Sequence, residues 1–257
     1  MNHQWLLDFT KLVATFRVFS DINEMIKRYK MNIKAFDNYK PMGNANNTLV
    51  SIIVPAKNDA RVLRRLLISL QRAHEKAEVI IADYASNDNT PLVARSFGAR
   101  VIEVDRPGVG YASFIAVNQA RGEIIIRTDA DAVFPPHLID YALNVFKRFK
   151  SVQIVNVGHI YLDSGIIDNL MAYLYDKYWR KPWNTTGHFI AFRRHVKDIV
   201  NFDPRLRYDE DWDFGQRAYE RLGRKVFHYN HMMTVFVSAR RIKTTGRMSY
   251  VLGRRVR

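Results

Sequence analysis

Hydrophobic and polar positions in the middle of the chain follow a pattern that predicts short strands separated by helices. Runs rich in β-branched residues predict strands at residues 49–54, 78–82, 100–104 and 123–127. Apolar residues at helical spacing predict helices at residues 60–74 and 112–120 and between Pro91 and Gly98. Strands and helices in alternation require right-handed crossovers. We therefore expect an α/β fold with a Rossmann-like, mostly parallel sheet flanked by helices.

The pattern is less regular after Phe134. Helices are expected at residues 137–149, 166–179 and 211–221, and strands at residues 152–157, 187–192 and 225–229. The C-terminal half is therefore expected to be a more irregular part of the same fold.

The two ends of the chain differ from the middle. Apolar residues recur at helical spacing near the start, at Trp5, Phe9, Leu12, Val13, Phe16 and Phe19. This helix could pack on the main domain, or it could lie on a membrane or a partner. We expect three parts: a helical extension and linker at 1–47, the main domain at 48–238, and a basic tail at 239–257.

Composition and charge narrow the classes of protein and partner. The 257 residues include 40 basic and 25 acidic ones, which gives a net charge of +15 and favours nucleic acid, a phosphorylated small molecule or acidic lipid as partner. The chain has no cysteine, so any metal must be bound by oxygen or imidazole. Since we find neither a membrane-spanning stretch nor a secretory signal, we expect a cytoplasmic location, with peripheral membrane contact as a further expectation.

Carboxylates at strand ends are the first candidates for chemistry, because ligands of such sheets bind beyond the carboxyl ends of the strands. Asp129 and Asp131 follow one predicted strand, where they could hold a hard divalent cation together with diphosphate oxygens. Two aspartates at this spacing are also common turn formers. Asp83 follows another strand and could accept hydrogen bonds from a nucleobase or ribose, or could cap a turn.

Three further groups of residues could take part. Arg106 lies beside two glycines after the third strand, an arrangement that suits phosphate but lacks the ending of a P-loop. Four acids within residues 209–213 exceed what helix capping needs, and one could be a general base. Histidines in this region usually have structural roles; among His188, His228 and His231, His228 is retained as a candidate metal ligand.

Taken in order, these segments resemble the family 2 glycosyltransferases with the GT-A fold. The matching stretches are residues 50–59, 79–83 with Ser86, Asp88 and Thr90, 120–123, 128–131 and 210–211. The resemblance covers about residues 49–246, with the later half corresponding to the acceptor side. It implies a hexosyltransferase that uses a nucleotide sugar such as a UDP- or GDP-sugar.

The resemblance also assigns roles to single residues. It implies that the nucleoside contacts Pro55, Ala56, Asn58 and Asp83. Asp129 and Asp131 would bind ribose and an Mn²⁺ or Mg²⁺ ion on the diphosphate. Arg106 would lie near the nucleotide, and Asp211 would be the general base of a single displacement that inverts the anomeric carbon.

Two departures from the family pattern qualify this expectation. In the loop that is usually Asp-Asp-Gly-Ser, Tyr84 occupies the second position and Ala85 the third, so nucleobase recognition could differ. The Gln-x-x-Arg-Trp element of processive synthases is not found, which favours transfer of a single sugar to an acceptor hydroxyl or a lipid phosphate.

Two other functions remain as alternatives. A nucleotidyltransferase would need a glycine-rich loop after the first strand, and residues 55–61 contain no glycine. A non-catalytic binder of nucleic acid or membrane would explain the charge. Nucleic acid ranks low as a partner, because only Tyr250 interrupts the basic tail as a stacking residue would.

Overall fold

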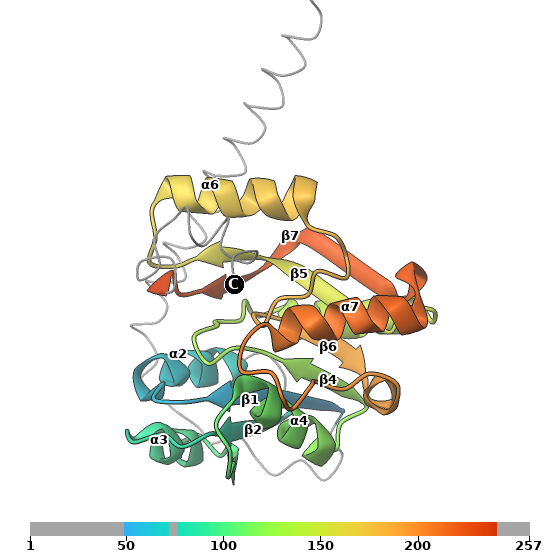
Figure 1. Cartoon of the computed structure of the whole chain (residues 1–257). Coiled ribbons are helices and arrows are strands. Elements are labelled where there is room, and N and C mark those ends of the chain that lie inside the picture. The colour runs from blue at the N-terminus through green and yellow to red at the C-terminus, as the bar shows by residue number, and fades with distance from the viewer. Residues whose placement is uncertain (1–48, 72–76, 241–257) are drawn as a thin grey trace, which may run out of the picture. The chain divides into compact units, whose positions relative to one another are not determined.

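The computed structural model describes residues 49–71 and 77–240 (Figure 1). All described residues belong to one compact unit of the chain, Lys40–Arg257. The expected N-terminal extension at 1–47 and nearly all of the expected basic tail lie outside the described residues.

Among the described residues, seven strands form one sheet in the order β3-β2-β1-β4-β6-β5-β7. Neighbouring strands pair in parallel except β6, which is antiparallel to both β4 and β5. The strands are β1 (Val50–Ala56), β2 (Ala77–Asp83), β3 (Arg100–Glu103), β4 (Ile124–Arg127), β5 (Ile154–Tyr161), β6 (Ile190–Arg193) and β7 (Phe227–Val237). The predicted mostly parallel sheet is confirmed.

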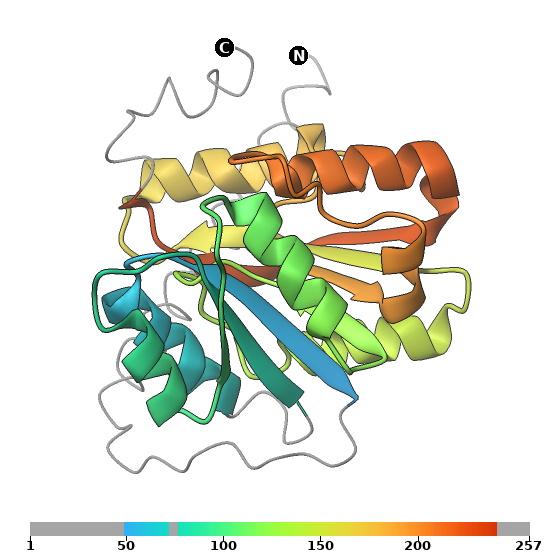
Figure 2. The same cartoon turned by 60° about the horizontal axis from the view of Figure 1, so that its bottom comes forward.

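Helices cover both faces of this sheet. They are α2 (Ala60–Gln71), α3 (Thr90–Ser96), α4 (Val109–Gln119), α5 (Leu138–Arg148), α6 (Ile166–Leu174) and α7 (Glu210–Leu222). The described part of the chain also has three short helical turns: a π-helical turn η1 (Tyr175–Trp179) and the 3₁₀ turns η2 (Arg194–Asp198) and η3 (Arg224–Val226). Figure 2 shows α4 lying across the near face of the sheet.

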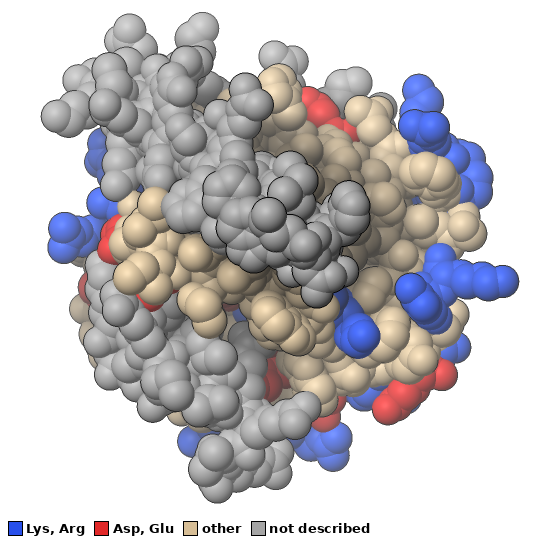
Figure 3. Space-filling view, turned by 90° about the horizontal axis from the view of Figure 1, so that it is seen from above, with Lys and Arg blue, Asp and Glu red and all other residues tan. Residues whose placement is uncertain are grey.

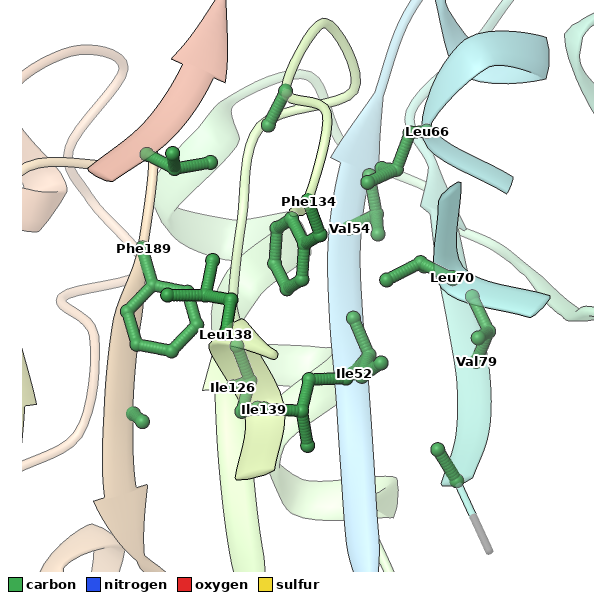
Figure 4. Close-up of a cluster of buried hydrophobic side chains, with 14 of the residues drawn as sticks. Ile52, Val54, Leu66, Leu70, Val79, Ile126, Phe134, Leu138, Ile139 and Phe189 are labelled. Carbon is green, nitrogen blue, oxygen red and sulfur yellow. The ribbon is translucent and has the colours of Figure 1, made fainter. Parts of the chain in front are cut away.

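Two apolar clusters fill the space between the sheet and its helices. One joins β1 and its neighbours to α2 and α5, through residues such as Ile52, Leu66 and Ile139 (Figure 4). In the same cluster the rings of Phe134 and Phe189 lie 5.5 Å apart between centroids. The other cluster lies on the opposite face and joins the sheet to α4 and α7. Because both faces are covered, the central strands β1 and β4 are mostly apolar on both sides rather than alternating.

The later strands differ most from the sequence-based expectation. The predicted strand at 152–157 continues to Tyr161, and the one at 225–229 continues to Val237. Gly158 interrupts the apolar pattern but keeps β5 close to its neighbour, since a Cβ there would lie 2.6 Å from the His231 carbonyl oxygen. The pairing of β5 with β7 shifts register at this point.

Candidate active site

Arg127 joins three segments at the carboxyl end of β4. Its side chain is buried, with 1 % of the residue exposed. The guanidinium Nη1 donates to Asp129 Oδ1 at 2.6 Å and to the Gly187 carbonyl oxygen at 2.5 Å, and Nη2 forms an ion pair with Glu210. The Asp129 turn, the loop before β6 and the first turn of α7 are thus held around one cation.

The charges around Arg127 shift one another's ionisation. Burial lowers the pKa of Arg127, but the carboxylates of Asp129 and Glu210 outweigh burial and hold that pKa above its ordinary value. Burial also raises the pKa of the Glu210 carboxyl above its ordinary value, against the opposing charge of Arg127. The guanidinium therefore remains charged and compensates the charge of the buried Glu210 and the partly buried Asp129.

The Asp211 side chain is fixed by the backbone around it. Asp211 Oδ2 accepts a hydrogen bond from the Gly187 N–H, and Oδ1 accepts one from the Trp212 N–H at 2.8 Å. The Thr185 hydroxyl donates to the Asp211 carbonyl oxygen. Position 187 must be glycine, because a Cβ there would overlap the Arg127 guanidinium and lie 2.8 Å from Asp129 Oδ1. The two aspartates therefore face the same short loop.

His188 and Arg240 complete the polar surroundings of the two strand-end aspartates. His188 Nδ1 lies 3.2 Å from Asp129 Oδ2, and its carbonyl oxygen accepts a hydrogen bond from the Thr128 hydroxyl at 2.8 Å. Arg240 follows β7, and its Nη2 lies 3.1 Å from Asp59 Oδ1 and 3.8 Å from Asp131 Oδ2. The first cation of the basic C-terminal stretch thus reaches the carboxyl ends of β1 and β4.

The loops after β1 and β2 are tied to each other. The Asn58 N–H donates to Ser86 Oγ at 2.9 Å, and Asn58 Oδ1 accepts from the Asn87 N–H at 2.7 Å. Pro55 and Ala56 close β1 with buried side chains, so a ligand would meet their backbone. The Ala56 carbonyl oxygen accepts a hydrogen bond from the Tyr84 N–H at 3.1 Å.

The two carboxylate oxygens of Asp83 differ in their hydrogen bonding. Its Oδ2 accepts from the Ser86 N–H at 3.3 Å. Its Oδ1 is buried and has no hydrogen-bond partner within the described part of the chain. An unsatisfied buried carboxylate oxygen is costly, and a ligand that donates to it would remove that cost.

Three non-glycine residues in the described ranges have positive φ, and all three flank this site. They are Asn58 (54°), Ala85 (63°) and Asp209 (57°). Asparagine and aspartate tolerate the left-handed region, whereas alanine there is strained by about 1 kcal/mol. The turn after β2 therefore keeps a conformation suited to glycine even though the sequence has Ala85, and such strain concentrates at functional sites.

Two of the predicted site residues lie apart from this group. Arg106 is exposed and stacks on Tyr111, with its guanidinium carbon 4.8 Å from the ring centroid. His228 is a correction to the sequence-based expectation. Its Nε2 lies 2.8 Å from the Tyr141 hydroxyl and its ring stacks on Phe149, so it belongs to the packing of α5 and does not join the aspartates as a metal ligand.

The oxygen donors fit a divalent cation that is shared with a substrate. Among the described residues, no group of three or more histidine, aspartate or glutamate side chains gathers as a metal site. Mg²⁺ and similar ions are commonly held by one or two carboxylates with substrate phosphates supplying the other ligands. Asp129 and Asp131, on one turn, match that arrangement better than they match an all-protein cage.

Sequence reasoning did not assign roles to Arg127 and Glu210. Arg127 ends an otherwise apolar strand, Ile-Ile-Ile-Arg, and a charged residue at that position is the feature that could have indicated its role. Glu210 stood within the acidic cluster that capping partly explains. The pattern could not show that the two side chains are buried together.

We expect Arg127→Met to lower the free energy of unfolding by about 3–5 kcal/mol, because it leaves the buried Glu210 and the partly buried Asp129 without their cation. Urea unfolding followed by circular dichroism measures this. Arg217→Met is the matched control: its pair with Asp213 is partly exposed, and its loss should cost about 0–1 kcal/mol. Equal losses in the two variants would contradict a central role for Arg127.

Comparison with known proteins identifies the family. The model of glycosyl transferase family 2 matches residues 51–203. A 4,4'-diaponeurosporenoate glycosyltransferase of Staphylococcus haemolyticus is 35% identical over 157 residues, which cover 56% of this chain and 42% of that protein. The protein of the same name from Staphylococcus aureus is 28% identical over 182 residues, covering 66% and 47%. The chain thus spans about half the length of these relatives.

Solved structures show the same fold. Glucosyl-3-phosphoglycerate synthase of Mycobacterium tuberculosis, in complex with Mn²⁺, UDP-glucose and phosphoglyceric acid, superposes with a TM-score of 0.59 at 21% identity, over 80% of this chain and 76% of that one. A mannosyltransferase of Pyrobaculum calidifontis in complex with GDP-mannose and Mn²⁺ gives 0.59 at 20% identity, over 90% and 67%.

The sheet and the helices on its two faces define the class of this protein as an α/β protein with a GT-A type fold. The chain belongs to glycosyl transferase family 2.

Proposed function

We propose that the protein transfers a single hexose from a UDP- or GDP-sugar to an acceptor, with inversion at the anomeric carbon and with help from Mn²⁺ or Mg²⁺. The observation that carries this proposal is the junction at Arg127. It brings the metal-binding candidate Asp129 and the general-base candidate Asp211 to the same glycine loop. Structural neighbours in complex with nucleotide sugars and Mn²⁺ support it.

The nucleotide-sugar donor would bind at the carboxyl ends of β1, β2 and β4. Asp83 Oδ1 would accept a hydrogen bond from the nucleobase or ribose, beside the Asn58 loop. Asp129 and Asp131 would hold the divalent ion, which supplies positive charge to the leaving diphosphate. Arg240, next to Asp131, would add a second cation at the same place. The sequence-based assignment of Arg106 remains a weaker proposal for the nucleotide side.

Asp211 would act on the acceptor as the general base. Its carboxylate, held by two backbone N–H groups, would accept the proton of the acceptor hydroxyl. The acceptor oxygen then forms a bond to the anomeric carbon as the bond from that carbon to the diphosphate breaks. Attack from the face opposite the leaving group inverts the centre. A phosphate acceptor would attack in the same way without giving up a proton.

The acceptor and the cellular setting are further parts of the proposal. We propose a hydroxyl or lipid-phosphate acceptor and a cytoplasmic enzyme with peripheral contact to an anionic membrane. The amphipathic pattern near Trp5 and the basic residues after Arg240 motivated that contact, and both lie outside the described residues. Within residues 49–71 and 77–240, no helix is long and apolar enough to cross a bilayer.

We expect Asp83→Asn to weaken nucleoside diphosphate binding by about 10- to 100-fold, since a carboxylate that accepts from the ligand becomes a partly mismatched amide. Calorimetric titration with UDP and with GDP in the presence of Mn²⁺ measures the change. Glu103→Gln, an exposed carboxylate at the end of β3, should leave binding unchanged.

Product analysis separates the enzyme classes. Incubation with a panel of nucleotide sugars and Mn²⁺ should release nucleoside diphosphate. Release of pyrophosphate instead would identify a nucleotidyltransferase. Tight, salt-sensitive binding of DNA without any response to nucleotide sugars would support a nucleic-acid binder and contradict the proposal.

A further inference from the structure

The segment formed by α6 and the π-turn η1 exposes its apolar side chains and buries its polar ones. The exposed set, called here the α6 outer face, consists of Ile166, Ile167, Met171, Tyr175, Tyr178 and Trp179. Trp179 is 63% exposed and Ile167 is 60% exposed. A surface helix of a globular protein normally shows the reverse pattern, with polar residues outside.

The inward side of the same segment explains why it is oriented this way. Asn169 donates to and accepts from the backbone of Tyr161, with its Oδ1 2.7 Å from the Tyr161 nitrogen. Asp176 Oδ2 accepts from the His159 N–H at 2.8 Å, and Asp176 Oδ1 accepts from Arg180 Nη1 at 3.2 Å. These buried hydrogen bonds fix the polar side inward and leave the apolar side outward.

Ionisation of Asp176 strengthens that orientation. Burial raises the pKa of its carboxyl, but the interactions with His159 and Arg180 outweigh burial and hold the pKa below its ordinary value. The charged Asp176 side chain therefore holds η1 through its buried partners and adds no negative charge to the surface. A π-helical turn allows it to point inward while Tyr175 and Tyr178, close to it in sequence, remain exposed.

The charge on this surface is of one sign. From Gly165 to Lys181, every exposed residue is glycine, an apolar or aromatic residue, or lysine. Both carboxylates in this range, Asp168 and Asp176, are buried. Lys177 Nζ lies 5.0 Å from the ring centroid of Tyr178, so one of the two exposed lysines sits directly among the aromatic residues. Figure 3, seen from the side on which α6 lies, shows uncharged side chains with lysine and arginine, and a few aspartates and glutamates, around them.

This combination matches the chemistry of a bilayer surface. Trp and Tyr prefer the level of lipid headgroups, aliphatic side chains reach the acyl boundary, and lysines pair with anionic headgroups. A docking site for an ordinary protein partner would not require that carboxylates be kept away from the surface. A group of neighbouring exposed apolar side chains on a folded domain indicates an interaction site.

The position of the face connects it to the active site. Residues 180–187 run directly from η1 to Gly187, and on the way the Thr185 hydroxyl donates to the Asp211 backbone. Arg180 secures the start of this run, with Nε donating to the Asn184 carbonyl oxygen at 2.9 Å. A bilayer lying on the α6 outer face would thus be joined by one short, hydrogen-bonded segment to the loop that holds the general-base candidate.

We propose that the α6 outer face docks on the surface of an anionic lipid bilayer, through Ile167, Tyr178 and Trp179 and with Lys177 and Lys181 contacting headgroups. The proposal concerns the same partner as the membrane contact proposed above but places it on different residues, in the folded domain. It does not depend on turnover, so it can be tested separately from the proposed function.

The absence of cysteine makes a position-specific test possible. Trp179→Cys in the full chain, labelled with an environment-sensitive fluorophore, should shift to the blue and lose quenching by iodide when phosphatidylcholine–phosphatidylglycerol vesicles are added. Leu92→Cys, equally exposed at 63% but on α3, is the matched control and should not respond. A protein that sediments with vesicles while the label at position 179 stays exposed would overturn the proposal.

A second pair of variants measures the strength of the contact. Ile167→Ser with Trp179→Ser should reduce affinity for anionic vesicles at least about tenfold, because two apolar side chains no longer enter the interface. Leu92→Ser should leave it unchanged, and unchanged thermal melting of all variants confirms folding. Equal affinity of the double variant and the wild type would overturn the proposal. So would a label response at position 179 that depends on protein concentration without vesicles, which would indicate a second copy of the chain.

Discussion

Asp211→Asn is expected to lower kcat by about 10²–10⁴-fold while the KM for the nucleotide sugar changes little. Asparagine keeps the shape of the side chain, and its Oδ1 can still accept the hydrogen bond from the Gly187 N–H. It cannot take a proton from the acceptor. Steady-state kinetics with the donor and acceptor found in the panel assay measure the effect.

The control for this variant is Glu220→Gln, an exposed carboxylate on the same helix α7. It should retain wild-type kinetics. If Asp211→Asn also retained wild-type kcat, the general base would lie elsewhere. With a phosphate acceptor, which has no proton to give up at the attacking oxygen, Asp211→Asn should lower kcat less. The size of the effect therefore also reports on the acceptor class.

Asp131→Asn is expected to lower kcat/KM by about 10²–10³-fold, since several kcal/mol of charge stabilisation would depend on the metal that Asp131 is proposed to help hold. The half-saturating concentration of Mn²⁺ should rise in the same variant. Activity measured across a Mn²⁺ series at fixed donor gives both quantities.

Asp140→Asn, an exposed aspartate in the first turn of α5, is the control and should follow the wild-type metal curve. Asp131 also lies near Arg240, so thermal melting of Asp131→Asn in the absence of metal separates loss of the ion from loss of that contact. If Asp131→Asn showed the wild-type Mn²⁺ requirement and rate, Asp131 would not be a ligand of the metal.

The positions of the strand-end aspartates could be predicted because they depend on local pattern and one topological rule. Four short apolar runs separated by helices specify parallel strands whose carboxyl ends meet at one edge. Asp83 and Asp131 therefore fall at that edge before any side chain is placed. The family resemblance added roles to positions that the pattern had already located.

Long-range burial could not be predicted in the same way. Arg127 and Glu210 are 83 residues apart in sequence, and nothing local shows that they form a buried ion pair. His228 was assigned to the metal by residue type and approximate position, whereas its ring nitrogen lies 2.8 Å from the Tyr141 hydroxyl of α5. The antiparallel direction of β6 depends on the path of residues 180–189, which carries no regular pattern.

For α6, the helix could be predicted from the sequence but its orientation could not. Residues 166–179 were correctly predicted to be helical from their apolar content. Which side faces outward depends on Asn169 and Asp176 finding buried partners on β5. Hydrophobic spacing alone favours burying the apolar side, and here tertiary hydrogen bonds overrule that preference.

A crystal structure of the full chain with Mn²⁺ and whichever of UDP and GDP it binds would test the proposed donor site. We predict the ion between the diphosphate and the Asp129–Asp131 turn, a donor group of the nucleoside at Asp83 Oδ1, and the Asp211 carboxylate facing the open side of the diphosphate. A nucleotide bound away from the ends of β1, β2 and β4, or an ion held without either aspartate, would contradict it.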